Sequence, residues 1–437
     1  MTRHTSIALG FLALILVGAI LLSSPWTRAD AQWGAFPDAL FTACSAVCVT
    51  GLSVVDLAQT WTRAGQCVIL ALVEVGCLGL MTCGTFLLVA IGRRLSLSRE
   101  FSLMNAYGVA EVQGLKGLIL WVVGSMLAIE GVGAALLFCR LRDAYLAVYY
   151  AVMSFSNAGF ALAPGSLAAF ADDPLVLLVL AAETILGGIG FLVLYNLCTF
   201  RFRRRRSGGR GRITLHSAVV LRFTLYLLAI GFVAFLALEW NGALAGFAPL
   251  KKLWVAFYQA VTPRTCGFTV VATDALRPLT LNVYEALMFI GGGPGSAAAG
   301  VKVTTLAVLF CTLRAMCRGE TDTVISRRTV PADVVRESFV IVSAMLALVW
   351  VVNGALSFTE AGRGIGDAAL AFEAISAVTT TGLSIGDTTA RLSPAGRVVV
   401  MCAMFAGRLG ALTVVMMIGD RESRRHVRYP NEELVVG

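Results

Sequence analysis

Charged residues are scarce in this sequence: they make up 14% of its 437 residues, against about 25% in an ordinary soluble domain. Hydrophobic residues make up 58%, and the mean hydropathy is +0.81. So few charges cannot keep the surface of a chain this long hydrated. The composition therefore excludes a soluble enzyme and a disordered chain. It predicts an all-α polytopic membrane protein of about eight to ten spans, since each helical crossing needs about 20 apolar residues.

The residues and motifs of metal and nucleotide chemistry are also missing. The chain has only three histidines and no Cys-x-x-Cys pair, and most of its 11 cysteines lie in apolar runs, where they act as small buried residues. It contains no GxxxxGK[ST] motif and no GxGxxG motif after a predicted strand. We therefore expect no organic cofactor in this chain, so a nucleotide that regulates it must bind another chain. A membrane enzyme is disfavoured, because no Asp/His constellation recurs.

Long apolar runs are the most abundant feature. The first, at 6–24, resembles a signal peptide followed by Ala29, Asp30 and Ala31, but we expect it to be a retained transmembrane segment because the repeat described below needs it. The other long runs lie near 66–92, 117–139, 175–200, 214–238, 280–316, 336–358 and 396–418. Four shorter stretches alternate with them, near 36–48, 145–157, 252–263 and 368–380. These are too short to span a bilayer but suit re-entrant half-helices.

Basic residues cluster after every second long run. The clusters are Arg93, Arg94 and Arg99; Arg201, Arg203–Arg206, Arg210 and Arg212; Arg327 and Arg328; and Arg421, Arg424, Arg425 and Arg428. By the positive-inside rule these connections, and both termini, are cytoplasmic. The stretch 201–212 could also be a nucleic-acid or lipid-headgroup patch, but its position between two spans favours topology. No nucleic-acid partner is predicted, and the net charge of +9 mainly marks the cytoplasmic rim.

The four short stretches end in the same pattern, a small residue, a glycine and a bulky residue. The glycines are 108, 108 and 115 residues apart. The four turns are Val49, Thr50, Gly51 and Leu52; Asn157, Ala158, Gly159 and Phe160; Thr265, Cys266, Gly267 and Phe268; and Thr380, Thr381, Gly382 and Leu383. Four such turns in register, at about a quarter of the chain length each, indicate an internal repeat.

Two further features recur with these glycines. An aromatic residue stands ten positions before each one: Phe41, Tyr149, Phe257 and Phe372. A G-x-[LI]-G pattern, expected inside the following helix, occurs at 76–79, 187–190 and 407–410. The repeat predicts four fused span–pore-loop–span units around one pseudo-fourfold axis: residues 1–100, 101–212, 213–328, and 329–437, the last with a cytoplasmic C-terminal tail.

Such turns suit a cation pore. Rings of backbone carbonyls can replace the hydration shell of a dehydrating cation, and glycine permits the backbone conformations that this requires. The C-terminal, partially negative ends of the half-helices favour a cation on the axis. Without a ring of carboxylates, a monovalent ion fits better than Ca²⁺ or Mg²⁺. The alternative, that the glycines serve close helix packing, is disfavoured because they end short stretches and precede polar residues.

At these residues the sequence resembles the Trk/Ktr/HKT superfamily of K⁺ transporters, over nearly the whole chain. The segments that carry the resemblance are 48–56, 156–160, 261–268, 293–302 and 405–410. The length is more similar to the KtrB branch than to the longer TrkH branch. Glycine at all four filter positions goes with K⁺ selectivity in this superfamily, so the resemblance implies K⁺ uptake across the bacterial cytoplasmic membrane and no enzymatic activity.

The resemblance also implies partners. It indicates a homodimer in the lipid bilayer and a cytoplasmic nucleotide-binding regulatory subunit of the TrkA/KtrA type, with K⁺ as the transported ion and Na⁺ as a candidate activator or co-ion. Two alternatives within transport remain open. One is the K⁺-binding subunit of a P-type potassium-pumping ATPase, and the other is a Na⁺-permeable member of the same superfamily, in which serine replaces the first filter glycine.

The resemblance places a gating loop at 291–302, where glycines and a proline interrupt the last span of the third unit. The expected gating residues are Gly291, Gly292, Gly293, Pro294, Gly295, Ser296, Gly300, Lys302 and Arg408. The Ala297–Ala299 stretch departs from the family pattern by a lost hydroxyl and a lost glycine. Lys302 could instead extend to the cytoplasmic interface.

Arg408 replaces a small residue at one repeat position in four. One interpretation is a buried ion pair with a carboxylate such as Glu74, Glu183 or Glu285. The interpretation that the resemblance favours is an electrostatic barrier on the pore axis.

Overall fold

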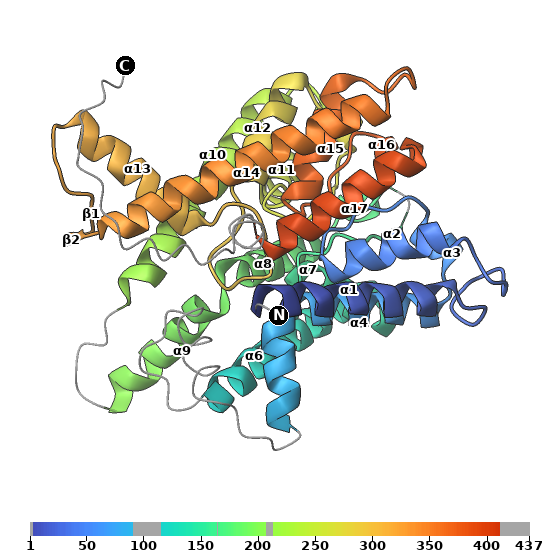
Figure 1. Cartoon of the computed structure of the whole chain (residues 1–437), viewed down its shortest axis with the longest axis horizontal. Coiled ribbons are helices and arrows are strands. Elements are labelled where there is room, and N and C mark those ends of the chain that lie inside the picture. Colours follow the sequence, from blue (N-terminus) through green and yellow to red (C-terminus); the bar gives the residue numbers. More distant parts are fainter. Residues whose placement is uncertain (1–2, 91–114, 164, 207–212, 411–437) are drawn as a thin grey trace, which may run out of the picture.

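The computed structural model describes residues 3–90, 115–163, 165–206 and 213–410 (Figure 1). Over this part of the chain it is mostly helical, and its one sheet is a ribbon of β1 (Val324–Ile325) and β2 (Arg328–Thr329). The predicted all-α class is therefore confirmed.

Each predicted unit begins with a long helix, continues with a short helix and ends in two further helices. The first unit has α1 (Arg3–Ser23), α2 (Phe36–Val47), α3 (Leu57–Thr60) and α4 (Arg63–Ala90), and the second has α6 (Leu115–Leu141), α7 (Ala144–Phe155), α8 (Pro174–Ile189) and α9 (Phe191–Arg206). The third has α10 (Leu215–Glu239), α11 (Pro249–Val261), α12 (Pro278–Phe289) and α13 (Val303–Cys317), and the fourth has α14 (Ala332–Thr359), α15 (Asp367–Val378), α16 (Thr388–Arg391) and α17 (Pro394–Leu409). Short 3₁₀ turns lie at Ala168–Phe170 and Thr273–Ala275.

The short helices α2, α7, α11 and α15 coincide with the four predicted half-helices, and their packing is cyclic. The helix that follows each half-helix packs against the half-helix of the next unit: α4 on α7, α8 on α11, α12 on α15, and α17 back on α2. The last contact joins the fourth unit to the first, so the contacts between the four units form a closed cycle.

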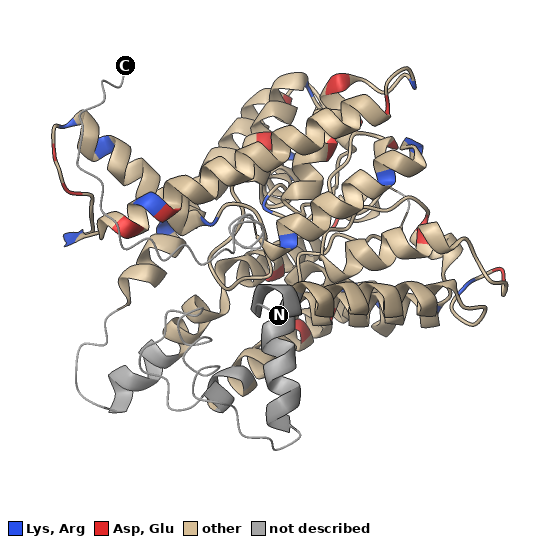
Figure 2. Cartoon of the chain, viewed as in Figure 1, with Lys and Arg blue, Asp and Glu red and all other residues tan. Residues whose placement is uncertain are grey.

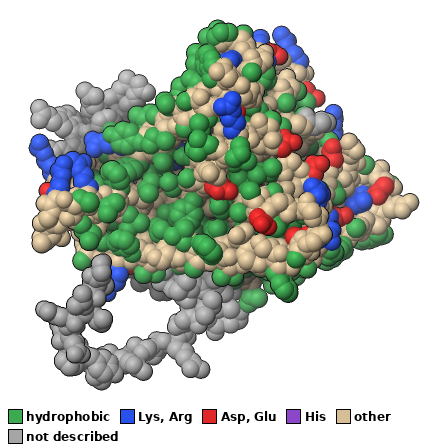
Figure 3. Space-filling model, turned by 90° about the horizontal axis from the view of Figure 1, so that it is seen from above, with side chains coloured by type: hydrophobic (Ala, Val, Ile, Leu, Met, Phe, Trp, Pro, Cys, Tyr) green, Lys and Arg blue, Asp and Glu red, His purple; other side chains and the backbone are tan. Residues whose placement is uncertain are grey.

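Three described helices are long and apolar enough to cross a membrane: Leu120–Leu141 within α6, α10 and α14. The α8–α9 pair adds a fourth if its 99° bend is counted within one span. This is fewer than the predicted eight to ten, because breaks divide the other apolar runs and part of the chain lies outside the described residues. Charged residues are sparse over the body of the molecule (Figure 2), and hydrophobic side chains cover much of the face seen in Figure 3. On α14, Trp350 and Phe358 are 76% and 84% exposed.

The G-x-[LI]-G patterns lie in the expected helices, where the first three residues of each are helical, but the last glycine breaks the helix. The last glycine of each has a left-handed φ, 73° at Gly79, 102° at Gly190 and 85° at Gly410. Gly79 kinks α4, Gly190 separates α8 from α9, and Gly410 caps α17. A residue with a Cβ atom disfavours this region, so glycine allows the chain to turn at these points.

Several predicted topological features lie outside the described residues. These are the clusters at Arg93–Arg99, Arg210–Arg212 and Arg421–Arg428, the end of the last apolar run, and the C-terminal tail.

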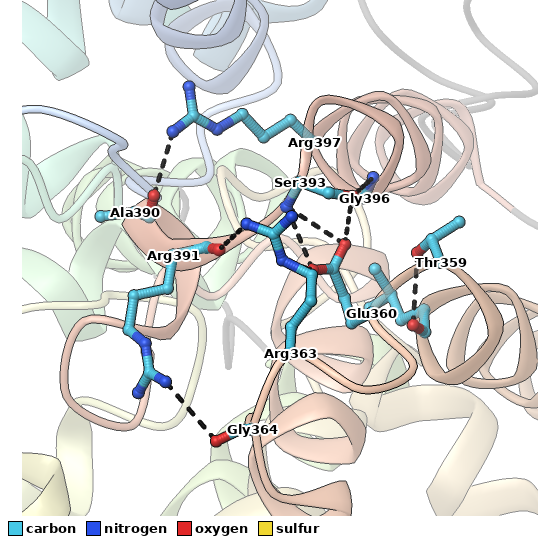
Figure 4. Close-up of polar contacts among 10 residues, drawn as sticks. Thr359, Glu360, Arg363, Gly364, Ala390, Arg391, Ser393, Gly396 and Arg397 are labelled. Atoms are coloured by element: carbon cyan, nitrogen blue, oxygen red, sulfur yellow. Dashed lines mark hydrogen bonds and ion pairs between the residues drawn. The ribbon is translucent and has the colours of Figure 1, made fainter.

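Buried polar contacts hold the fourth unit together near its closure with the first (Figure 4). Glu360, at the end of α14, accepts hydrogen bonds from the backbone N–H and the hydroxyl of Ser393, which caps α17. Its other partner is the half-exposed Arg363, at 3.2 Å. From α17, Arg397 reaches Asp38 on α2 at 2.9 Å. The carboxylate of Glu360 thus fixes the start of the helix that closes the cycle.

Glu360→Ala is expected to lower the free energy of unfolding by about 3 kcal/mol, because it removes charged hydrogen bonds and leaves a buried N–H unpaired. Arg363→Ala is the matched control. It removes only an exposed partner, so we expect a change below about 1 kcal/mol. Thermal unfolding of the detergent-solubilised protein measures both, and equal melting temperatures for the two variants would contradict the assignment.

Candidate functional site: four glycine turns and an intramembrane loop

Three of the four half-helices end in the same hydrogen-bonded turn. In the first unit the N–H of Thr50 donates to the carbonyl of Ser45, and the N–H of Val49 donates to that of Ala46. The second and fourth units repeat both bonds, from Ala158 to Met153, Asn157 to Ser154, Thr381 to Ser376 and Thr380 to Ala377. This is the Schellman arrangement, in which the first residue beyond the helix cap is left-handed.

The four glycines of the turns meet one another. A Cβ atom added to Gly51 would lie against the carbonyl oxygen of Ala158, and one on Gly159 against that of Cys266. One on Gly267 would lie against the carbonyl oxygen of Thr381, and one on Gly382 against that of Thr50. Each glycine therefore approaches the carbonyl that precedes the next glycine, and the four contacts close a ring.

Exposure varies within each turn in the same way. Gly51, Gly159, Gly267 and Gly382 are all partly exposed, whereas the residues on either side of each one are buried. The backbone at these glycines is thus accessible to solvent between buried neighbours.

Every turn also carries a second residue with a left-handed φ, two positions before its glycine. The values are 56° at Val49, 57° at Asn157, 68° at Thr265 and 49° at Thr380. Three of these residues are β-branched, for which this region is a strong outlier. Strain of this kind persists only where surrounding structure enforces it and is typical of ligand clamps.

The third turn is built differently from the other three. There the N–H of Cys266 donates to the carbonyl of Thr262, and the Thr262 hydroxyl donates to the carbonyl of Phe268. The aromatic ten positions before the glycine is fully buried in the other three units, at Phe41, Tyr149 and Phe372, but in the third unit Phe257 is partly buried and its neighbour Tyr258 is fully buried.

The helices behind the half-helices approach them through glycine. Cβ atoms on Gly76, Gly187 and Gly407 would overlap the carbonyl oxygens of the last half-helix residues, which are Val47, Phe155 and Val378 respectively. The first glycine of each G-x-[LI]-G pattern thus sets how closely the two helices pack at the ring.

Gly187→Ala should displace α8 from α7 and destabilise the fold by about 1–3 kcal/mol, the usual effect of overpacking. Gly188→Ala is the matched control, because its added Cβ would meet only the Asn157 amide nitrogen, at 3.5 Å. Melting temperatures of the two variants measure the difference. Destabilisation of both to the same degree would show that helix propensity, and not the contact with Phe155, is responsible.

The loop predicted at 291–302 separates α12 from α13 and folds back on itself. Gly291 donates to the carbonyl of Val301, and Val301 donates to that of Phe289, so the two ends of the loop run side by side. The loop also docks on the second unit, where Gly293 donates to Gly188 and Phe191 donates to Gly295. It therefore contacts the break between α8 and α9 directly.

Arg408 and Lys302 both donate to carbonyls of this loop. The Arg408 guanidinium bonds Ala297 and Gly76 at 2.6 Å each, and the Lys302 ammonium bonds Ala298 at 2.6 Å. No ion pair joins Arg408 to Glu74, Glu183, Glu285 or any other carboxylate of the described residues, so the ion-pair interpretation is wrong. Backbone carbonyls take the place of a carboxylate. Lys302 turns back onto the loop, so the alternative of an extended side chain is not observed.

Sequence reasoning missed Arg264. Its guanidinium is only 7% exposed and donates to the carbonyl of Gly291 at 3.3 Å. The signal was available, because the same position in the other three turns holds a small residue: Cys48, Ser156 and Thr379.

Comparison with known proteins identifies the family to which this chain belongs. The profile of the TrkH family, described as cation transport proteins, matches residues 11–426. The chain belongs to the TrkH family of cation transport proteins. Among its relatives, the Ktr system potassium uptake protein B of Bacillus subtilis is 35% identical over 99% of this chain and 96% of its own length. The potassium/sodium uptake protein NtpJ of Enterococcus hirae is 34% identical over the same shares.

A solved structure shares the fold. The potassium transporter TrkH of Vibrio parahaemolyticus superposes with a TM-score of 0.72 at 17% identity, over 94% of this chain and 84% of that one. The resemblance to the Trk/Ktr/HKT superfamily is therefore confirmed, as is a multi-pass membrane protein of the cation transporter class.

Proposed function

We propose that this TrkH-family protein takes up K⁺ across the cytoplasmic membrane through a filter formed by its four glycine turns. The observation that carries the proposal is the closed ring, in which each turn presents a partly exposed glycine and adjacent turns approach through backbone carbonyls. Carbonyl oxygens on such a ring can replace the water around a monovalent cation. The names of the relatives from Bacillus subtilis and Enterococcus hirae agree with K⁺ as the cargo.

Each turn would contribute four residues to the filter, those named from the repeat at 49–52, 157–160, 265–268 and 380–383. The half-helix ends bring four partially negative termini toward the ring. No described group of three or more His, Cys, Asp or Glu residues is arranged to hold a metal ion. The backbone would therefore hold the ion, which suits fast release better than a carboxylate cage.

The loop 291–302 would act as the gate, with Arg408 as an electrostatic barrier and Lys302 beside it. These two side chains donate hydrogen bonds to the adjacent loop carbonyls of Ala298 and Ala297. Two positive charges near the path oppose cation entry, so opening requires the loop and its basic residues to move. The membrane potential would supply the driving force, about 2.3 kcal/mol per charge per 100 mV.

Partners and topology belong to the same proposal. A homodimer with both termini cytoplasmic, regulated by a nucleotide-binding ring of the TrkA/KtrA type, fits the family. Na⁺ is the second candidate ion, as activator, co-ion or permeant, because the relative from Enterococcus hirae is named for both potassium and sodium.

Growth of a K⁺-uptake-deficient bacterium at limiting K⁺ tests this function. The wild-type gene, with or without a Ktr-type regulatory subunit, is expected to restore growth, and Na⁺ should not replace K⁺. Absence of rescue and of Rb⁺ uptake in every partner background would refute K⁺ transport. Rescue only with a P-type ATPase chain would favour the pump-subunit alternative.

A further inference from the structure

We propose that Arg264 couples the third filter turn to the intramembrane loop, so that the position of the loop affects ion discrimination at the ring. This inference rests on the proposed function. It assigns a positioning role to a residue that neither the repeat nor the basic residues of the loop had indicated.

The placement of Arg264 joins two parts of the site. Along the chain it directly precedes Thr265, the left-handed residue of the third turn, and lies three residues before Gly267. Its side chain reaches the carbonyl of Gly291, where α12 has ended and the loop begins. One residue therefore has its backbone in the ring and its guanidinium on the first hinge of the loop.

The contact is buried and replaces a feature found in the other units. In units one, two and four the residue at this position is small, and a glycine of the following helix packs directly against the end of the half-helix. In the third unit an added Cβ on Gly291 would meet the carbonyl of Ala299, within the loop itself. The direct contact between helices is thus replaced by an arginine that connects the half-helix to the loop.

The loop is held by basic side chains at three points, and only one of them comes from a filter turn. Arg264 donates to Gly291, Arg408 to Ala297 and Lys302 to Ala298. Arg408 lies on the last turn of α17 and Lys302 at the end of the loop, so their contacts involve no residue of the four glycine turns. Arg408 and Lys302 therefore hold the loop alone, whereas Arg264 connects the loop to the ring of glycine turns.

The Arg264 contact is also incomplete. Its Nε–H is buried and has no hydrogen-bond partner. Buried donors are rarely left unpaired, and a guanidinium can bind a carbonyl through several N–H groups. When the loop moves, this unpaired N–H can donate a hydrogen bond to a further carbonyl of the loop. Because Arg264 belongs to the third turn, the backbone of that turn would respond to the movement.

Arg264→Met, Lys302→Met and Arg408→Met, each reconstituted alone in K⁺-loaded liposomes, distinguish the roles. Tracer Rb⁺ flux reports the gate, and inhibition of that flux by external K⁺ against Na⁺ reports the filter. All three variants should raise flux, since each releases the loop. Only Arg264→Met should also lower the K⁺-over-Na⁺ ratio, by about tenfold, a typical strength of coupling between sites. Arg140→Met, which removes an exposed ion pair with Asp173, should change neither.

Arg264→Lys completes the test, because it keeps a positive donor with a different geometry. Its ratio is expected between those of wild type and Arg264→Met. A wild-type ratio in Arg264→Met, whatever its flux, overturns the coupling, as does an equal loss of ratio in all three methionine variants. Where Arg264→Met yields no folded protein, a wild-type ratio in Arg264→Lys overturns it. Failure of the proposed function is distinct, since then the wild-type protein carries no Rb⁺.

Discussion

Gly51→Ser is expected to abolish most of the preference for K⁺ over Na⁺ while leaving the protein folded. The added Cβ would meet the carbonyl of Ala158, and φ at this position is 92°. Holding a residue with a side chain in such a conformation costs about 1–3 kcal/mol, so the turn should relax away from its neighbour. The carbonyls then no longer surround an ion on all four sides, and discrimination between ions of different size should fall by about tenfold or more.

The measurement is Rb⁺ uptake in competition with K⁺ and Na⁺, in cells and in liposomes. Gly362→Ser is the matched control, because Gly362 has a φ of 79° but no atom within 4 Å of an added Cβ. Equal strain without the contact should leave selectivity unchanged. Unchanged selectivity in Gly51→Ser, or equal losses in both variants, would remove the first turn from the filter.

Arg408→Met should increase K⁺ flux through the protein in the absence of a Ktr-type regulatory subunit. The substitution removes a positive charge and three donors to the carbonyls of Ala297, Gly76 and Cys77. Repulsion between like unit charges is about 4 kcal/mol at about 4 Å and an effective dielectric constant of about 20, and it falls with distance. Removing it should raise flux by on the order of tenfold or more, with added effect from the released loop.

Tracer flux at fixed membrane potential measures this effect. Arg391→Met is the control, since Arg391 also donates to a backbone carbonyl, that of Gly364 at 3.5 Å, but from an exposed turn (Figure 4). Its flux should equal that of wild type. Equal or reduced flux in folded Arg408→Met would contradict the barrier role and leave Arg408 as a structural clamp.

Features that depend on local chemistry could be predicted from the sequence. The four half-helices were found from apolar runs too short to span, and the ring glycines from their spacing. The positive φ at Gly51 and its three counterparts agrees with the backbone freedom for which glycine was singled out at these positions. The loop at 291–302 was visible because no other residues interrupt a helix as strongly as glycine and proline.

Features that depend on long-range contacts could not be predicted. The G-x-[LI]-G patterns were placed in helices, but the helix breaks at their last glycines were not predicted. The sequence pattern alone does not show that Gly79, Gly190 and Gly410 adopt a left-handed φ. An ion pair was one interpretation of Arg408, but its guanidinium instead donates hydrogen bonds to backbone carbonyls of the loop and of α4. Which backbone groups a folded loop presents cannot be read from composition. The comparison of the four repeats could have singled out Arg264, but not its partner, which is a main-chain oxygen 27 residues away.

The most direct test of the central claim is ion flux through the purified protein in liposomes with an imposed, inside-negative potential. We predict Rb⁺ uptake above that of empty liposomes, competed by K⁺ at concentrations about tenfold or more below those required of Na⁺. Addition of a Ktr-type regulatory subunit should change the rate of Rb⁺ uptake but not the preference for K⁺ over Na⁺ as competitor. Flux no greater than in empty liposomes, with and without that subunit, or equal competition by Na⁺ and K⁺, would contradict a K⁺-selective carbonyl filter.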